Sequence, residues 1–293
     1  MTAVPLFDPE KFKAATREQW NQSATGWNDK SAQIRDWLRD STSAMLEMAN
    51  IKTGSRVLDV AAGAGDQTLD IAKRVGPSGS VLATDLSPAI LEYAKGNAQR
   101  AGYSNVETKA VDGENLGVEE ASFDAAVCRL GLMFYPDPAK GLREIFRALK
   151  PGGRACTTVF SSPDKNPCVA ILVSTAFKHA GLPPRDPYQP GGLLSLGKPG
   201  LIDELFQKAG FSEVATTKVL APFRLPSAKD YLDFIRTSAG PILQILSKLD
   251  ETRKQAAWAE IEDKLSAFNT ASGWEGPNEL LLTAGRRRTL LQR

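Results

Sequence analysis

A short glycine-containing segment in the first quarter of the chain has the residue types of a ligand-binding turn. Gly63 and Gly65 follow an apolar run that ends at Val60, and a helical pattern begins directly after them. Glycines there allow a tight turn and a close approach of the backbone to a ligand, and the helix start presents free N–H groups. Asp59 lies four residues before Gly63. Its carboxylate would repel a pyrophosphate but suits a ligand with a cationic amino group.

Two nucleotide-type ligands compete for this turn. A dinucleotide fingerprint requires a third glycine three positions after Gly65, but Thr68 stands there, so that pattern is incomplete. Asp85 lies 20 residues beyond Gly65, where an acidic side chain can accept hydrogen bonds from both ribose hydroxyls. Asp112, after the third apolar run, can accept from an adenine amine. These carboxylates favour a nucleoside ligand that carries a cationic group and no phosphates.

The composition argues against several other kinds of site. The 293 residues include 36 Lys plus Arg against 34 Asp plus Glu, and this near-neutral balance supplies no field for a nucleic acid. The three cysteines form no CxxC pair, and His179 is the one histidine, so no metal site is expected. Residues 1–13 lack the apolar stretch of a secretory signal. We therefore predict a cytoplasmic protein with no metal, no nucleic-acid partner and no membrane span.

Alternating strand and helix patterns must position these residues. Strands are predicted at 56–60, 80–84, 106–110, 123–128 and 154–161, with helices at 66–74, 88–101 and 139–149. This alternation predicts a parallel sheet with helices on both faces. Ligands of such sheets bind at the carboxyl ends of the strands, which is where the carboxylates above are found.

The flanking segments complete a single α/β domain. A helical pattern at 9–49, broken near Gly26, comes first, and strand patterns recur at 213–219 and 279–283 on either side of a helical block. We predict a doubly wound, mostly parallel, seven-stranded Rossmann-like sheet. Its expected parts are an N-terminal helical arm (1–50), an α/β core (51–162), a helical insertion over one end of the sheet (163–210), and the remaining strands and helices (211–293).

Several motifs in a fixed order resemble the class I S-adenosylmethionine-dependent methyltransferases. They are the segments QWNQSATGW, VLDVAAGAGDQT, ATDLSPAIL, AVDGENL and SFDAAVCRLGLMFYPDPAKGLREIFRALKPGGR. The resemblance covers about residues 17–158 and is greatest to the ubiquinone/menaquinone-biosynthesis type. It implies a methyltransferase fold, S-adenosylmethionine as the cofactor, S-adenosylhomocysteine as its product, and a small-molecule acceptor under the helical insertion.

The resemblance also implies which residues would contact the cofactor. They are Asp59, Ala61, Gly63, Gly65 and Arg129 at the methionine end, Asp85 at the ribose, and Leu86, Asp112 and Gly113 at the adenine. Ala61 stands where many members have the first glycine of a DxGxGxG pattern, and this is a small change. The cofactor end of the site is thus expected in the loops after the first four strands.

The acceptor is expected between the N-terminal arm and the insertion. Trp20 and Trp27 are seven residues apart, so they either face the core along one helical stripe or line the acceptor site, where aromatic rings attract a cationic centre. Further apolar walls are predicted from Phe134, Leu193, Leu194 and Leu196. A small, largely apolar metabolite is the acceptor that these residues favour.

The implied reaction is an in-line displacement by an N, S, C or O atom of the acceptor. Holding acceptor and methyl group in line can supply roughly 7 to 11 kcal/mol, so a thiol, an amine or an activated carbon needs no dedicated base. A hydroxyl acceptor must lose its proton, and the weak candidates for that role are Tyr135, Glu114 and His179. His179, near a helix end, is better interpreted as a cap. The catalytic group, if there is one, stays unassigned.

Two alternatives remain open from the sequence. One is a nicotinamide-dependent oxidoreductase, which Asp59 and Thr68 disfavour; the other is a protein that binds S-adenosylmethionine without catalysis. The expected assembly is a monomer or a homodimer.

Overall fold

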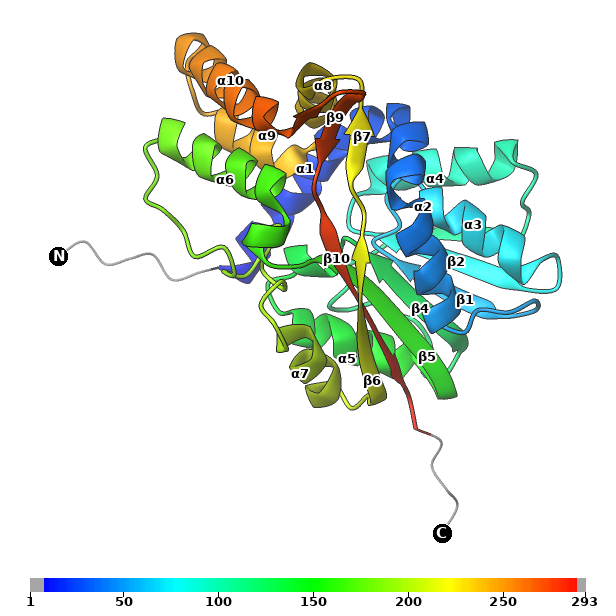
Figure 1. Cartoon of the computed structure of the whole chain (residues 1–293). Helices are drawn as coiled ribbons and strands as arrows, with labels where there is room; N and C mark the ends of the chain where they lie inside the picture. The colour runs from blue at the N-terminus through cyan, green and yellow to red at the C-terminus, as the bar shows by residue number, and fades with distance from the viewer. Residues whose placement is uncertain (1–7, 289–293) are drawn as a thin grey trace.

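A seven-stranded sheet forms the centre of the computed structural model, which describes residues 8–288 (Figure 1). Its strand order is β3-β2-β1-β4-β5-β10-β6. The strands are β1 (Arg56–Val60), β2 (Ser80–Asp85), β3 (Val106–Ala110), β4 (Phe123–Arg129), β5 (Leu149–Phe160), β6 (Ser212–Leu220) and β10 (Glu279–Arg286). β10 runs antiparallel to β5 and β6, and the other neighbours are parallel. The predicted doubly wound, mostly parallel sheet is confirmed.

Helices cover both faces of this sheet. α2 (Ser31–Met48), α3 (Asp66–Val75) and α4 (Pro88–Arg100) lie on one face, and α5 (Pro138–Ala148) and α7 (Leu201–Lys208) lie on the other (Figure 1). The start of α4 is fixed by its sequence: the Ser87 hydroxyl accepts from the Ile90 N–H at 3.2 Å, and Pro88 takes the first helical position. The loop between β2 and α4 is thereby fixed at its α4 end.

A second group of elements lies beyond the carboxyl ends of the parallel strands (Figure 1). It consists of α1 (Pro9–Asp29), α6 (Pro167–His179), α8 (Ala228–Ser238), α9 (Gly240–Leu246), α10 (Glu251–Leu265) and a small sheet of β7 (Phe223–Leu225), β9 (Gly273–Gly276) and β8 (Asn269–Thr270). Short 3-10 turns are η1 (Leu132–Phe134), η2 (Pro163–Lys165) and η3 (Ser266–Phe268). The small sheet was not predicted, because strands of two to four residues are too short to show an alternating pattern.

The N-terminal helical pattern breaks at Lys30 and continues unbroken through Gly26, so the predicted break near Gly26 is wrong. Gly26 has a packing role instead. A Cβ atom at this position would lie 1.8 Å from the backbone oxygen of Thr237 on α8. Glycine here allows α1 and α8 to approach closely, and this close approach holds α1 against the second group of elements.

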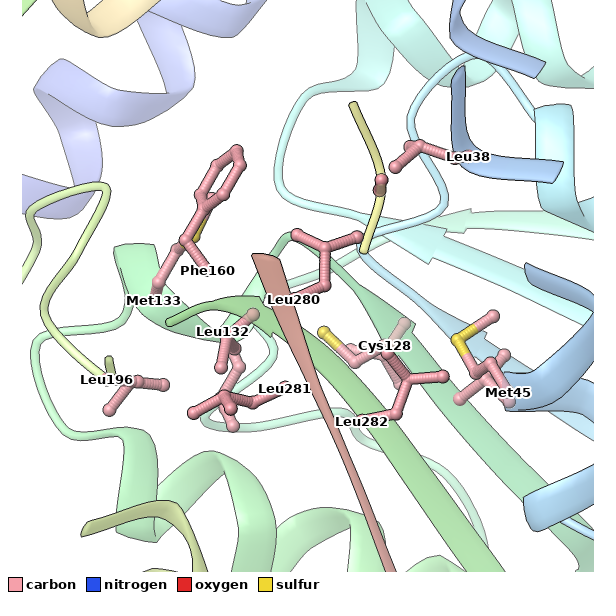
Figure 2. Close-up of a cluster of buried hydrophobic side chains, with 14 of the residues drawn as sticks. Leu38, Met45, Cys128, Leu132, Met133, Phe160, Leu196, Leu280, Leu281 and Leu282 are labelled. Carbon is pink, nitrogen blue, oxygen red and sulfur yellow. The ribbon is translucent and has the colours of Figure 1, made fainter. Parts of the chain in front are cut away.

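The strand β10 contributes buried side chains to the core on both faces of the sheet. Because side chains alternate along a strand, Leu280 and Leu282 point to one face and Leu281 to the other. Figure 2 shows Leu282 near Met45 of α2, whereas Leu281 lies near Leu196. All of these side chains are at most 5% exposed. A strand buried on both faces explains the continuous apolar run in its sequence.

Candidate functional site

A cavity opens at the carboxyl ends of β1, β2, β3 and β4, and we call it the first cavity. Its walls are the loops after these strands together with α1, which contributes Lys13, Thr16, Trp20 and Trp27. Of the residues predicted for the cofactor or the acceptor, those that line it are Ala61, Gly63, Asp85, Leu86, Asp112, Gly113, Arg129, Trp20, Trp27 and Phe134. The fold therefore gathers residues from five separate motifs around one space.

The loop after β1 takes a strained path along this cavity. Ala61 has a φ of 54° and Gly63 a φ of 59°, and both values lie in the left-handed region. That conformation is easy for glycine but costs free energy for alanine. In the resulting turn the Gly63 N–H donates to the Asp85 carboxylate, with 3.0 Å between the nitrogen and Oδ2.

Asp85 is the carboxylate that faces the first cavity at the end of β2. Its Oδ1 accepts from the Ser87 N–H at 2.9 Å, and its Oδ2 accepts from the Gly63 N–H. Burial raises the pKa of Asp85, and these backbone donors act in the opposite direction. Each carboxylate oxygen has a second lone pair, so the group can still accept from hydroxyl groups of a ligand.

Asp59 and Gly65, which the sequence placed at the cofactor, lie behind the cavity wall. Asp59 is fully buried and accepts from Gln67 Nε2 at 3.1 Å and from Thr68 Oγ1 at 2.6 Å. Burial raises its pKa to about 6, although both hydrogen bonds lower it. Gly65, with a φ of 91°, starts α3 where a Cβ atom would lie 3.0 Å from Ala94 Cα. Both residues hold the glycine turn in shape from behind.

Lys13 joins α1 to the loop after β3. Its Nζ lies 2.7 Å from Asp112 Oδ2 and 2.8 Å from Glu114 Oε2. Burial lowers the pKa of Lys13, but the hydrogen bonds and charges of the two carboxylates outweigh burial and raise it. No sequence pattern indicates this contact, because Lys13 and Asp112 are 99 positions apart. An adenine amine at Asp112 would share the carboxylate with this lysine.

Arg129, at the end of β4, is a buried cation that lines the first cavity. Its Nη1 donates to Thr42 Oγ1 of α2 at 2.8 Å, and its Nη2 lies 4.0 Å from Asp66 Oδ2. Asp66 Oδ2 has no hydrogen-bond partner within residues 8–288. Burial lowers the pKa of Arg129, while the charge of Asp66 raises it. Thr42, which the sequence analysis missed, fixes the direction of a guanidinium group suited to a carboxylate.

A second cavity adjoins the first, and four residues line both: Trp20, Trp27, Leu130 and Phe134, which we call the shared wall. The ring centroids of Trp20 and Trp27 are 5.5 Å apart with an edge-to-face angle of 87°, and Trp20 meets Phe134 at 5.9 Å. Leu130 adopts a left-handed φ of 57°. Strain in a bulky residue at this junction is typical of functional positions.

The second cavity is apolar. Its other lining residues are Trp37, Met133, Phe160, Val169, Leu172, Leu193, Phe223, Tyr231, Phe234, Ile235, Ser238, Ala239, Pro241, Ile242 and Asn278, and none of these carries a charge. Phe134 and Leu193, which the sequence predicts as walls of the acceptor site, both line this cavity. Leu194 and Leu196 do not: they are buried in the core, where Figure 2 shows Leu196 near Leu281. The walls from α8 and α9 were missed, because their apolar stripe is equally typical of ordinary helix packing.

The three candidate bases lie outside the second cavity. Tyr135 and Glu114 line the first cavity, where the Tyr135 hydroxyl lies against Gly113 and Glu114 accepts from the Asp137 N–H at 2.7 Å. Burial raises the pKa of Tyr135 well above 10. His179 Nε2 lies 2.8 Å from Glu260 Oε2 on α10, within a small ion-pair cluster. This placement is in keeping with a structural role for His179.

No helix within residues 8–288 combines the length and the hydropathy needed to cross a membrane. In the same range, no three His, Cys, Asp or Glu side chains come together where they could hold a metal ion.

Part of the chain matches a family of known methyltransferases in sequence. The model of the ubiE/COQ5 methyltransferase family matches residues 30–179. The demethylmenaquinone methyltransferase of Lactococcus lactis is 40% identical over 111 residues, which are 38% of this chain and 44% of that protein. The chain thus spans less than half the length of the curated relatives it matches. Residues 30–179 include most of the lining residues of the first cavity and a minority of those of the second.

Solved structures share the fold over most of the chain. The YcgJ protein of Bacillus subtilis superposes with a TM-score of 0.58 at 21% identity, covering 85% of this chain and 99% of that one. Phosphoethanolamine N-methyltransferase 2 of Haemonchus contortus, solved in complex with S-adenosyl-L-methionine, has a TM-score of 0.55 at 19% identity and covers 89% of this chain and 57% of that one. At such identities the likeness extends to the fold alone.

Proposed function

The chain belongs to the ubiE/COQ5 methyltransferase family, and from that premise we propose that it transfers a methyl group from S-adenosylmethionine to a small, largely apolar acceptor. One observation carries the proposal. Two cavities meet at the shared wall, and the first is lined by carboxylate and guanidinium groups, whereas the described lining residues of the second include no charged side chain. A polar cofactor and an apolar acceptor fit this division.

The first cavity offers a partner for each part of S-adenosylmethionine. In this proposal Asp85 accepts from the ribose hydroxyls, Leu86 packs on the adenine, and Asp112 with Gly113 reads the adenine amine. Arg129, held by Thr42, pairs with the methionine carboxylate, and the backbone at Ala61 and Gly63 surrounds the methionine end. Asp59 and Gly65 support that turn. Charge-assisted bonds of this kind are the strong ones in proteins.

The shared wall is where the reaction would take place. The cofactor, when bound, supplies a methyl group on a sulfonium centre. Trp20, Trp27 and Phe134 offer aromatic rings, which attract a cation and exclude water. α1 and the insertion would act as a lid that holds acceptor and methyl group in line, and this positioning can supply roughly 7 to 11 kcal/mol.

The described lining residues of the second cavity include no side chain that could act as a base near neutral pH. Tyr231 is the one ionisable side chain among its described lining residues, and burial raises its pKa well above 10. It therefore stays protonated near neutral pH and cannot act as a base there. We infer that the acceptor atom needs no protein base, as holds for a thiol, an amine or an activated carbon.

A labelling experiment tests the proposal. The purified chain is incubated with S-adenosylmethionine carrying an isotopic label in its methyl group and with a panel of small apolar thiols, amines, phenols and enols, and mass spectrometry detects the transferred label. Asp85→Ala serves as the control that should not transfer. Saturable cofactor binding without transfer to any acceptor would instead favour the non-catalytic alternative.

The oxidoreductase alternative is tested separately. In the structure Thr68 stands in place of the third fingerprint glycine, and its hydroxyl donates to the buried Asp59. S-adenosylmethionine should therefore raise the melting temperature while NAD does not. Stabilisation by NAD alone would overturn the assignment. A cytoplasmic monomer or homodimer remains the proposed state.

A further inference from the structure

The second cavity contains two polar side chains with unused hydrogen-bonding capacity. Tyr231 on α8 and Asn278, two residues after β9, both line it and are each 4% exposed. Within residues 8–288 the Tyr231 hydroxyl makes no hydrogen bond. The Asn278 side chain makes a single one there, from its Nδ2 to the Gly276 carbonyl at 3.2 Å. Buried polar groups are normally paired, so these two groups require an explanation.

The other polar groups of this cavity are already committed. Away from the shared wall these are Ser238 and Trp37. Ser238 Oγ donates to the Phe234 carbonyl at 2.5 Å, and Trp37 Nε1 donates to the Ala221 carbonyl at 2.7 Å. Away from the shared wall, the Tyr231 hydroxyl and Asn278 Oδ1 are thus left as one free side-chain donor and one free side-chain acceptor among the described lining residues.

Both side chains contact the same strand of the small sheet, β9. The Tyr231 ring stacks on Trp274 of β9, with centroids 4.6 Å apart and an angle of 24°. Trp274 is itself fixed, because its Nε1 donates to the Leu265 carbonyl at 2.7 Å. The Asn278 carboxamide is tied to Gly276 of the same strand. A donor and an acceptor fixed before binding are typical of a recognition point.

We propose that Tyr231 and Asn278 bind a hydroxyl group of an otherwise apolar, uncharged acceptor. The Tyr231 O–H donates to the hydroxyl oxygen, and Asn278 Oδ1 accepts the hydroxyl proton. This inference rests on the proposed function and specifies its substrate: the apolar body fills the aromatic cavity, and the hydroxyl is anchored at the β9 corner. The absence of charged lining residues excludes an ionic anchor in the described walls. Because burial raises the pKa of Tyr231, its hydroxyl keeps the proton that it donates.

Binding of two matched probes tests the inference without the cofactor. 2-Naphthol and naphthalene share one apolar body, and the former adds one hydroxyl group. Equilibrium dialysis measures both affinities for the full chain and for Tyr231→Phe. We expect the substitution to weaken 2-naphthol binding about five- to tenfold, the usual worth of one hydrogen bond, and to leave naphthalene binding unchanged. Asn278→Leu should show the same selective loss.

Two controls separate recognition from packing. Tyr103→Phe removes a tyrosine hydroxyl that lines neither cavity and should change neither affinity. Tyr231→Phe should not lower the melting temperature of the free protein, because the hydroxyl has no protein partner to lose. Equal weakening of both probes, unchanged 2-naphthol binding in Tyr231→Phe, or no binding of either probe to the wild-type chain would each overturn the inference. Calorimetry with S-adenosylmethionine on the same samples reports the first cavity independently, so failure there would concern the proposed function.

Discussion

The first and second cavities share a wall but are built in opposite ways. The first is assembled mainly from loops that follow neighbouring strands, and the backbone N–H groups of Gly63 and Ser87 in two of these loops hold Asp85. The second is assembled from segments spread between α1 and residue 278, and its described lining residues include no charged side chain. Much of the polarity of the first cavity follows from local sequence, whereas the shape of the second follows from tertiary packing. This difference explains how a fold can keep one ligand and change the other.

The largest expected effect breaks the first cavity and leaves the second intact. Asp85→Ala removes the charged acceptor for two ribose hydroxyls, so calorimetry should show the affinity for S-adenosylmethionine falling about 100-fold or more. Naphthalene binding should not change. Asp124→Ala is the matched control, because Asp124 also accepts from a backbone N–H, that of Arg56 at 2.8 Å, but lines neither cavity. An Asp85→Ala protein that is folded and binds the cofactor normally would refute the site.

The second effect concerns the stability of the turn behind the first cavity. Because burial raises the pKa of Asp59 to about 6, the folded chain holds this proton to higher pH than the unfolded chain does. Stability from this group is therefore present below pH 4 and is lost as the pH rises to about 6. Asp59→Asn, which stays neutral, should be more stable than wild type by about 2 to 3 kcal/mol at pH 7.5 and equally stable at pH 4.

Urea unfolding at the two pH values measures this difference. Asp124→Asn is the control and should lose stability at pH 7.5, because its carboxylate pairs with Lys150 at 2.6 Å. An Asp59→Asn protein that is less stable than wild type at pH 7.5 would mean that the charged form of Asp59 is required for the turn.

The third effect breaks both cavities together. Trp20→Ala removes a ring from the shared wall. The affinities for S-adenosylmethionine and for naphthalene should each fall about three- to tenfold, because aromatic contacts are lost. Trp258→Ala removes a ring of the same size on α10, which lines neither cavity, and should change neither affinity. If Trp20→Ala weakened the binding of only one ligand, the Trp20 side chain would contribute to binding in only one of the two cavities.

The smallest effect is expected at the lone histidine. His179→Ala should leave turnover within about twofold on whichever acceptor the labelling screen identifies, because His179 lines neither cavity and Lys178 and Lys264 still pair with Glu260. Initial rates across pH 6 to 9 would check this. A drop of about 100-fold, the usual worth of a general base, would contradict the structural role.

Much of the first cavity could be predicted because its signals are local. A carboxylate or a glycine directly after an apolar strand is visible in a few consecutive residues, as at Gly63, Asp85 and Asp112. Burial depth was not visible: Asp59 lies behind the wall because Gln67 and Thr68 of α3 fold back on it. A glycine within a helical pattern can mark either a break in the helix or a close contact between two helices, and Gly26 makes a close contact.

Most of the second cavity escaped prediction because its residues meet only in three dimensions. Tyr231 and Asn278 are 47 positions apart and are joined through a small sheet whose strands carry no readable pattern. Lys13 and Thr42 are similar cases, since each touches a partner that lies 87 or more positions away. Single residues of this kind have no signature until the packing of α1 and α2 on the sheet is known.

We expect the two cavities to hold two different ligands at the same time. Calorimetric titration of S-adenosylmethionine into the chain, first alone and then in saturating 2-naphthol, measures whether they do. We predict saturable one-to-one binding in both titrations, with an affinity that 2-naphthol leaves unchanged or increases. No binding heat, or an affinity that falls in proportion to the 2-naphthol concentration, would contradict it, because the two ligands would then have no separate places in the structure.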